Sequence, residues 1–158
     1  MYKIYLVLIF IILNISLLSA QNEQLNNIQT INDSLKILVE NIQNSDIFWD
    51  GDDIGYMPRR FGGSSGILFG SSNLVKAIPN LTEALLDSQR FVAAHVLLTS
   101  LNTYVEIMKN GCYNGISMDI IEFKTPITEE CLKRIYNRWE KSLKNEEYLL
   151  DNTNCISE

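Results

Sequence analysis

The feature that most constrains this chain is an uncharged apolar run over residues 4–18, which follows Lys3 and gives way to polar residues at 21–24. A short apolar run with a basic residue before it and small residues after it is typical of a secretory signal peptide. Ser19 and Ala20 supply the small residues, so we expect residues 1–20 to be removed. The folded protein would then act in a secreted or periplasmic location.

An uncleaved anchor is the alternative interpretation of this run. Leu18 occupies a position where the cleavage pattern usually has a small residue. However, the run is shorter than the about 20 apolar residues that a transmembrane helix needs, and Asn14 interrupts it. We therefore expect a membrane as a partner only if the N-terminal segment stays attached.

The composition is that of one small globular domain. Of the 158 residues, 46% are apolar, and only 8 are Gly, 3 are Pro and 3 are Cys, which excludes collagen-like, low-complexity and disulfide-dense proteins. The chain carries 13 basic and 19 acidic side chains, for a formal charge of -6. Because capture of a nucleic acid needs a surplus of Lys and Arg, we expect no nucleic-acid partner.

Residues 21–45 are predicted to form an N-terminal helix. Their apolar side chains recur at steps of three and four, which places them on one face: Ile28, Ile31, Leu35, Leu38 and Ile42. The stripe spans only two heptads, fewer than a coiled coil normally has. We therefore expect the helix to pack on the core of its own chain, with self-association as the alternative.

Residues 46–72 are predicted to form a Gly-rich aromatic loop. The segment holds six of the eight glycines, together with Pro58 and four aspartates, so neither a helical nor a strand period persists through it. Short strands are expected only at residues 47–49 and 67–69. Long loops within a small domain often carry function.

Residues 73–150 are predicted to form the helical core, ahead of a flexible tail at 151–158. A helix pair is followed by a turn at Asn114-Gly115 and an alternating strand over residues 116–120. The last helix opens at Thr128, and its buried stripe has helical spacing: Leu132, Ile135, Tyr136, Trp139 and Leu143. The expected fold class is mostly α, with a helix pair, a short strand or hairpin and a C-terminal helix.

Residues 77–101 resemble a HEAT-type helical repeat. The resemblance rests on Pro79 near the start of the first helix, Asp87 in the turn, and the Arg90-Phe91-Val92-Ala93-Ala94 start of the second helix. It implies a helix pair and a binding scaffold. The sequence holds no second copy, and a repeat fold normally needs three or more units, so no solenoid is expected. The whole chain also resembles small secreted or anchored proteins, a resemblance that implies no activity.

The segment Gly62-Gly63-Ser64-Ser65-Gly66 fits the G-x-S-x-G pattern of a hydrolase nucleophile elbow. Ser64 would be the nucleophile, and His95, the single histidine, would be its base. An elbow needs a core strand before it and a helix after it, and the sequence predicts neither. We therefore expect a Gly-Ser loop, with His95 as a structural residue held by one ring nitrogen.

Asp50, Asp52 and Asp53 form a compact acidic turn that could offer oxygens to a calcium ion. The turn does not match the spacing of an EF-hand and lacks its closing Glu. The scattered cysteines and single histidine have no zinc-ligand spacing. A solvated turn is expected, with no metal and no other cofactor.

The three cysteines leave at least one thiol without a partner in the chain. In a secreted protein Cys112 and Cys131 could form a bridge, with Cys155 free in the tail. Alternatively, Cys131 stays reduced and packs as a small apolar side chain beside Leu132.

These features favour a non-catalytic module whose partner is another protein. The alternatives are a small hydrolase or metal-assisted enzyme that uses the Gly-rich loop and His95, and a membrane-anchored oligomerising protein that uses the stripe from Ile28 to Ile42.

Overall fold

A computed structural model describes the backbone of residues 2–52, 55–101, 108–109, 111–122 and 124–144. Side chains are described from residue 18 onward within these ranges, except at 20, 50–52, 55–57, 59 and 108–109. The chain divides into two compact units, Met1–Ser34 and Leu35–Glu158.

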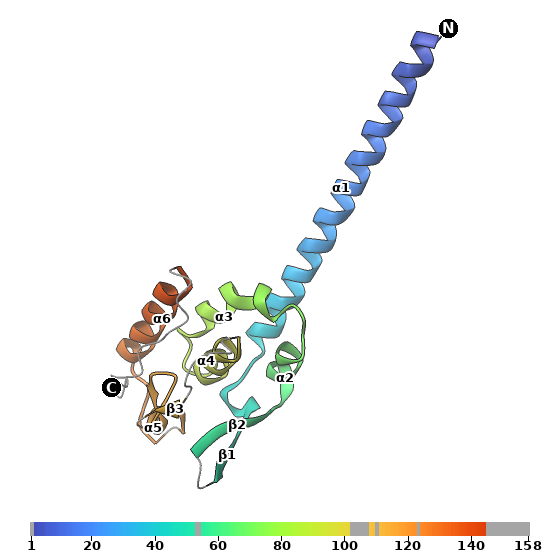
Figure 1. Ribbon diagram of the computed structural model, residues 1–158. Helices are drawn as coiled ribbons and strands as arrows, with labels where there is room; N and C mark the ends of the chain where they lie inside the picture. The colour runs from blue at the N-terminus through green and yellow to red at the C-terminus, as the bar shows by residue number, and fades with distance from the viewer. Residues whose placement is uncertain (1, 53–54, 102–107, 110, 123, 145–158) are drawn as a thin grey trace. The chain divides into compact units, whose positions relative to one another are not determined.

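A single long helix, α1 (Tyr2–Glu40), makes up the described part of the first unit and the start of the second (Figure 1). In the first unit Ile28 is 56% exposed, whereas Leu35, Val39 and Ile42 in the second unit are buried. Within the second unit, Leu35 and Ile42 of the predicted stripe therefore belong to the core, as expected.

No helix in the part of the chain that the structure describes is long and apolar enough to cross a membrane.

The segment predicted as a loop folds into regular structure in the second unit. A 3-10 turn, η1 (Asn44–Asp46), leads into the antiparallel hairpin of β1 (Ile47–Asp52) and β2 (Gly55–Phe61), and helix α2 (Gly63–Phe69) follows. The register shifts between Phe48 and Trp49, opposite Arg60 and Pro58. Such an irregularity accommodates Pro58, which has no amide proton for the ladder. The interpretation of residues 46–72 as mainly a loop was wrong, whereas the short strand expected at residues 47–49 is confirmed as the start of β1.

Helix α2 depends on glycine geometry and on one distant carboxylate. Gly63 has φ +49, and a Cβ on Gly66 would lie 2.8 Å from the carbonyl oxygen of Phe61, so both positions require glycine. The carboxylate of Asp46 accepts hydrogen bonds from the Ser65 amide at 3.3 Å and the Ser65 hydroxyl at 2.8 Å. Residues 67–69, expected as a strand, therefore end a helix.

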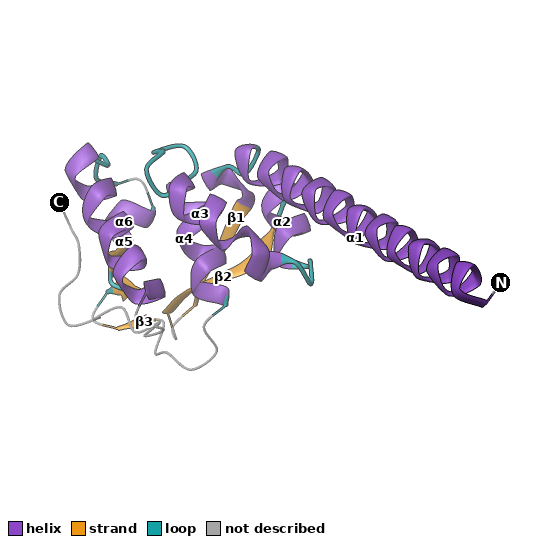
Figure 2. Ribbon diagram, turned by 90° about the horizontal axis from the view of Figure 1, so that it is seen from above, coloured by secondary structure: helices purple, strands orange, loops and turns teal. Residues whose placement is uncertain are grey.

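Helix α4 (Phe91–Ser100) is central to the core of the second unit (Figure 2). It follows η2 (Leu74–Ala77) and α3 (Ile78–Ala84), in which Pro79 stands in the first turn, where its missing amide proton costs nothing. Nine of the ten residues of α4 are buried, so it is covered on all sides. The predicted helix pair is confirmed.

A three-stranded antiparallel sheet contains β3 (Met108–Lys109), β4 (Cys112–Tyr113) and β5 (Ile116–Ser117). Asn114 and Gly115 have φ values of 46 and 82, as a two-residue hairpin turn with both φ positive requires. The hydroxyl of Ser117 accepts a hydrogen bond from the Asp119 amide and caps α5 (Met118–Ile121). The predicted hairpin is confirmed, but the strand ends at Ser117 because that cap starts a helix.

The C-terminal helix α6 (Glu129–Lys144) confirms the sequence pattern. Thr128 accepts a hydrogen bond from the Cys131 amide at 3.1 Å and so caps the first turn. Leu132, Ile135 and Trp139 are buried, whereas Tyr136 and Leu143 of the expected stripe are half-buried. The fold class is mostly α, as predicted, and the expected tail at residues 151–158 lies outside the described residues.

The cysteines are arranged differently from the bridge hypothesis. Cys112 is disulfide-bonded, whereas Cys131 is a free thiol and only 1% exposed. A bridge between these two residues was therefore a wrong hypothesis, and Cys131 packs as the small apolar side chain of the alternative interpretation. Cys155 lies outside the described residues.

We expect the unfolded, unreduced protein to contain fewer than three titratable thiols, because Cys112 is disulfide-bonded whereas Cys131 is free. Burial raises the pKa of the Cys131 thiol, so the folded protein should react slowly with the same reagent. Ellman titration with denaturant measures the thiol count, and the same titration without denaturant measures how fast the buried thiol reacts. Cys131→Ala should lower the thiol count by one, and a count of three in the native protein would contradict the arrangement.

Candidate functional site

His95 lies in the middle of α4 and is fully buried. Its Nδ1 lies 2.9 Å from Nε1 of Trp139 in α6, and its Nε2 lies 3.1 Å from the carbonyl oxygen of Tyr113 in β4. An indole nitrogen can only donate, so Nδ1 accepts and Nε2 carries the proton. The expected structural role of His95 is confirmed, with both ring nitrogens bonded instead of one.

Burial lowers the pKa of His95 to about 4, a shift that its hydrogen bond to the Tyr113 carbonyl opposes and the positive charge of Arg138 reinforces. The imidazole is therefore neutral near pH 7. A general base needs a nitrogen that can reach the proton it removes. Since both nitrogens bond to fixed protein groups, His95 joins α4, β4 and α6 and does not form a base for Ser64.

Further polar groups surround this contact in the interior. Asn114 donates from Nδ2 to the Thr99 hydroxyl at 2.7 Å, and Arg138 donates to the Gly115 carbonyl at 3.2 Å. The Oδ1 atom of Asn114 is buried and has no hydrogen-bond partner among the described residues. The polar groups thus hold the turn of the β4–β5 hairpin between two helices.

Ser64 is the second residue of α2, and only Gly62 separates this helix from β2, so the expectation that neither a strand nor a helix flanks the segment was wrong. The elbow itself is missing nonetheless. A nucleophile elbow places its serine on a strained turn, but Asn114 is the only non-glycine residue with positive φ in the described chain, and the positive φ near Ser64 belongs to Gly63. The adjacent Ser65 is buried and bonded to Asp46.

The aspartates proposed as calcium ligands fall where the structure describes no side chains. Asp50 and Asp52 lie in β1, their side chains are not described, and Asp53 lies outside the described residues. No group of three or more His, Cys, Asp or Glu side chains that could hold a metal ion occurs in the described part of the chain.

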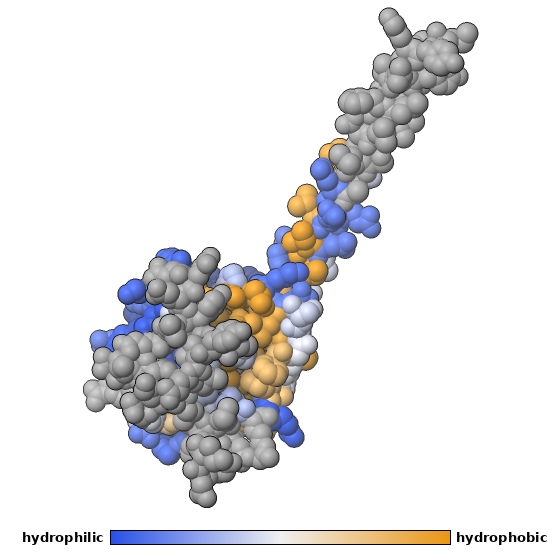
Figure 3. Space-filling view, in the orientation of Figure 1, coloured by the Kyte–Doolittle hydropathy of each residue, from blue (hydrophilic) through white to orange (hydrophobic). Residues whose placement is uncertain are grey.

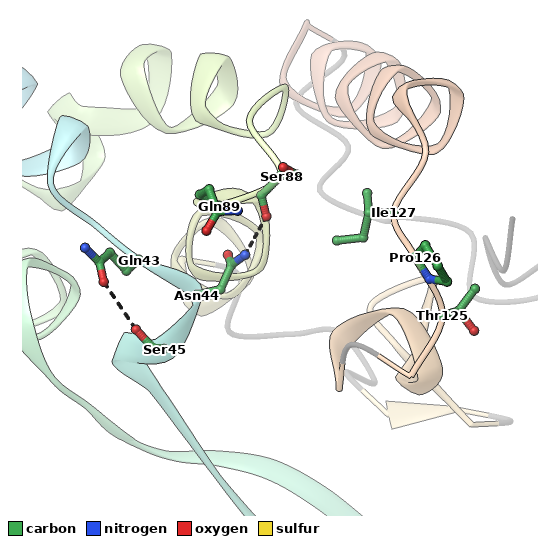
Figure 4. A pocket seen from close by; sticks show the side chains of 8 residues that line it. All are labelled: Gln43, Asn44, Ser45, Ser88, Gln89, Thr125, Pro126 and Ile127. Atoms are coloured by element: carbon green, nitrogen blue, oxygen red, sulfur yellow. Dashed lines mark hydrogen bonds between the residues drawn. The ribbon is translucent and has the colours of Figure 1, made fainter.

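A pocket of about 480 Å³ opens in another part of the second unit (Figure 4). It lies between η1, the turn before α4 and the segment that connects α5 to α6. The side chain of Ile127 points across the pocket toward Asn44 and Ser88 (Figure 4). Eight residues line it: Gln43, Asn44, Ser45, Ser88, Gln89, Thr125, Pro126 and Ile127.

Asn44 fixes two of the pocket walls together. Its Oδ1 accepts hydrogen bonds from the amides of Val92 at 2.7 Å and Ala93 at 3.3 Å, which are orphan donors at the start of α4. Its Nδ2 donates to the Ser88 carbonyl at 2.6 Å, and its own amide donates to the Gln89 carbonyl at 2.9 Å. Asn44 therefore caps a helix 48 positions away in the chain.

The sequence analysis missed this pocket. Asn is a common capping residue, but the pattern gives no reason to pair residue 44 with a helix that starts at Phe91. A sequence signal for a cap is local, whereas this cap forms only in the tertiary structure.

Asn44→Ala should lower the free energy of unfolding by about 2 kcal/mol, because the cap of α4 and the bond to Ser88 are both lost. Asn44→Asp keeps an acceptor for the helix and should recover part of the loss. Urea unfolding followed by circular dichroism measures these differences. Asn137→Ala, at an exposed position of α6, is the matched control and should change the value by less than about 0.5 kcal/mol.

No protein-family model, curated protein or solved structure matches this chain significantly.

Proposed function

We propose that the chain is a secreted or periplasmic, non-catalytic module that binds another protein. The observation that carries the proposal is a set of large apolar side chains that the second unit leaves in solvent. Ile67 is 60% exposed, Val75 is 62% exposed and Leu86 is 47% exposed. We call these three residues the apolar surface. Large apolar side chains in solvent suit an interaction site where they lie together, and we propose that these three do.

The position of the apolar surface supports a protein partner. The space-filling view has an apolar area on the face where α2 and α3 lie (Figure 3). Ile67 belongs to α2, Val75 belongs to η2, and Leu86 follows α3. The HEAT-type resemblance of residues 77–101, which implies a binding scaffold, covers part of the same region.

The use of the polar side chains supports a non-catalytic role. Both ring nitrogens of His95 bond to Trp139 and Tyr113, and the buried hydroxyl of Ser65 bonds to Asp46. Each of these groups stabilises the fold. No observation in the described residues favours the hydrolase alternative.

Site-specific photocrosslinking in the native envelope or culture medium tests the proposal. A photoreactive amino acid at position 75 should give a discrete crosslinked species, whereas one at Lys141, on the exposed face of α6, should not. An affinity-tagged double variant, Ile67→Asp with Val75→Asp, should no longer capture the partner protein that the tagged native protein captures. Both positions are exposed, so the variant should keep the native unfolding midpoint.

Two outcomes would contradict the proposal. The first is the absence of any crosslink at position 75 under conditions where the protein is correctly exported. The second is capture of the same partner protein, in equal amount, by the native protein and by the double Asp variant.

A second candidate, a membrane-anchored oligomerising protein, is favoured by one observation in the first unit. Leu25 and Ile28 on α1 are 63% and 56% exposed. The candidate needs residues 1–20 to remain attached, which intact mass and N-terminal sequencing decide. It also requires a sedimentation mass above that of the monomer, and Leu25→Ser with Ile28→Ser should return that mass to the monomer value.

A further inference from the structure

The pocket at the start of α4 has the chemistry of a binding site for neutral, hydroxyl-rich ligands. Its volume of about 480 Å³ is within the range of small-molecule sites. Five of its residues carry uncharged amide or hydroxyl groups besides Asn44, and none of the eight carries an ionisable side chain: Gln43, Ser45, Ser88, Gln89 and Thr125.

The helix terminus in the pocket does not suit an anion. Free amide protons at a helix start normally attract phosphate or carboxylate groups. Here Asn44 accepts from the amides of Val92 and Ala93, and the Phe91 amide bonds to the Asp87 carbonyl at 2.8 Å. Asp87 and Arg90, next to the lining residues Ser88 and Gln89 in the chain, form an ion pair with each other at 2.8 Å. A charged ligand would lose hydration without a counter-charge on the pocket wall.

Several lining groups keep hydrogen-bonding capacity. The side chains of Ser88, Gln89 and Thr125 make no hydrogen bond within the described residues, and each can both donate and accept. Sugar hydroxyls have the same double character. Pro126 and Ile127 add an apolar wall that suits the C–H face of a sugar ring.

The hydrogen bonds of Asn44 hold the polar walls of the pocket in place before a ligand binds. Its bonds to the Ser88 and Gln89 carbonyls fix the turn that carries two of the free side chains. A preorganised site loses less conformational freedom on binding. We propose that this pocket binds an uncharged saccharide, independently of the apolar surface and its protein partner.

Nuclear magnetic resonance titration of the purified, isotope-labelled protein tests this proposal. The probes are three neutral disaccharides (maltose, cellobiose and lactose), the charged sugar glucuronate and a capped, uncharged tripeptide. At least one disaccharide should shift the backbone amides of residues 43–45, 88–89 and 125–127 in a saturable way. Gln89→Ala and Thr125→Val should each weaken that binding about fivefold to tenfold.

Asn137→Ala, which removes an exposed amide outside the pocket, is the control and should leave the affinity unchanged. Thermal melting of each variant shows that the fold is intact. The proposal is overturned if no disaccharide shifts these amides up to its solubility limit, or if the pocket variants bind like the native protein. Stronger binding of glucuronate or of the tripeptide than of every disaccharide would also overturn it, because the ligand class would be wrong.

Discussion

Between pH 6.5 and about pH 4 the protein should lose about 3 kcal/mol of its free energy of unfolding through His95. The pKa of His95 falls from its ordinary value of 6.5 to about 4 on folding, mainly because burial disfavours the imidazolium. In this pH range the unfolded chain binds a proton that the folded chain excludes. The contribution of neutral His95 is therefore full above pH 6.5, falls as the pH drops and is gone below about pH 4.

Urea unfolding at pH 7 and at pH 4.5 measures this loss. His95→Gln is the informative variant, because its side-chain oxygen can still accept from Trp139 but does not titrate. Its free energy of unfolding should be lower at pH 7, yet should change less than that of the native protein between the two pH values. An equal pH dependence in both proteins would show that other groups, such as surface carboxylates, cause the loss.

Trp139→Ala should lower the free energy of unfolding by about 3–5 kcal/mol, the largest single effect that we expect. Trp139 is 1% exposed, and its indole donates the hydrogen bond that holds Nδ1 of His95. The variant removes the largest fully buried side chain and leaves a buried acceptor without a donor.

Trp139→Phe separates these two contributions. It keeps most of the packing volume but loses the indole N–H, so its cost should be about 1–3 kcal/mol. Tyr136→Ala, at a half-buried position on the same helix, is the control for loss of an aromatic ring and should cost clearly less than Trp139→Ala. If Trp139→Phe were as stable as the native protein, the bond to His95 would contribute nothing to stability.

Local patterns predicted the elements that carry their own signals. Helix α6 has a capping residue, acidic residues in its first turn, basic residues in its last turn and one apolar stripe. The helix over residues 128–144 could therefore be predicted without tertiary information. The turn at Asn114-Gly115 was readable for a similar reason, because few residue types accept two successive positive φ values.

Elements that depend on distant contacts were not predictable. The low helix propensity of glycine and serine argued against a helix at residues 63–69, and α2 forms because Asp46 and the glycine geometry supply what propensity does not. The hydrogen-bond partners of His95 also depend on distant contacts. The sequence placed His95 on a helix but could not place Trp139 or the Tyr113 carbonyl against its ring, since these groups come from other elements.

The long-range cap by Asn44 also bears on the order in which the chain folds. Helix α4 cannot complete its first turn from its own sequence, because the acceptor for two of its amides is located 48 positions earlier. Closure of so long a loop costs chain entropy, and the hydrogen bonds of the cap can offset this cost only after the loop has closed. A translation product released before residue 91 holds the acceptor without its helix, and a fragment that begins after residue 46 holds the helix without its acceptor. Either piece alone therefore lacks the hydrogen bonds between Asn44 and the start of α4.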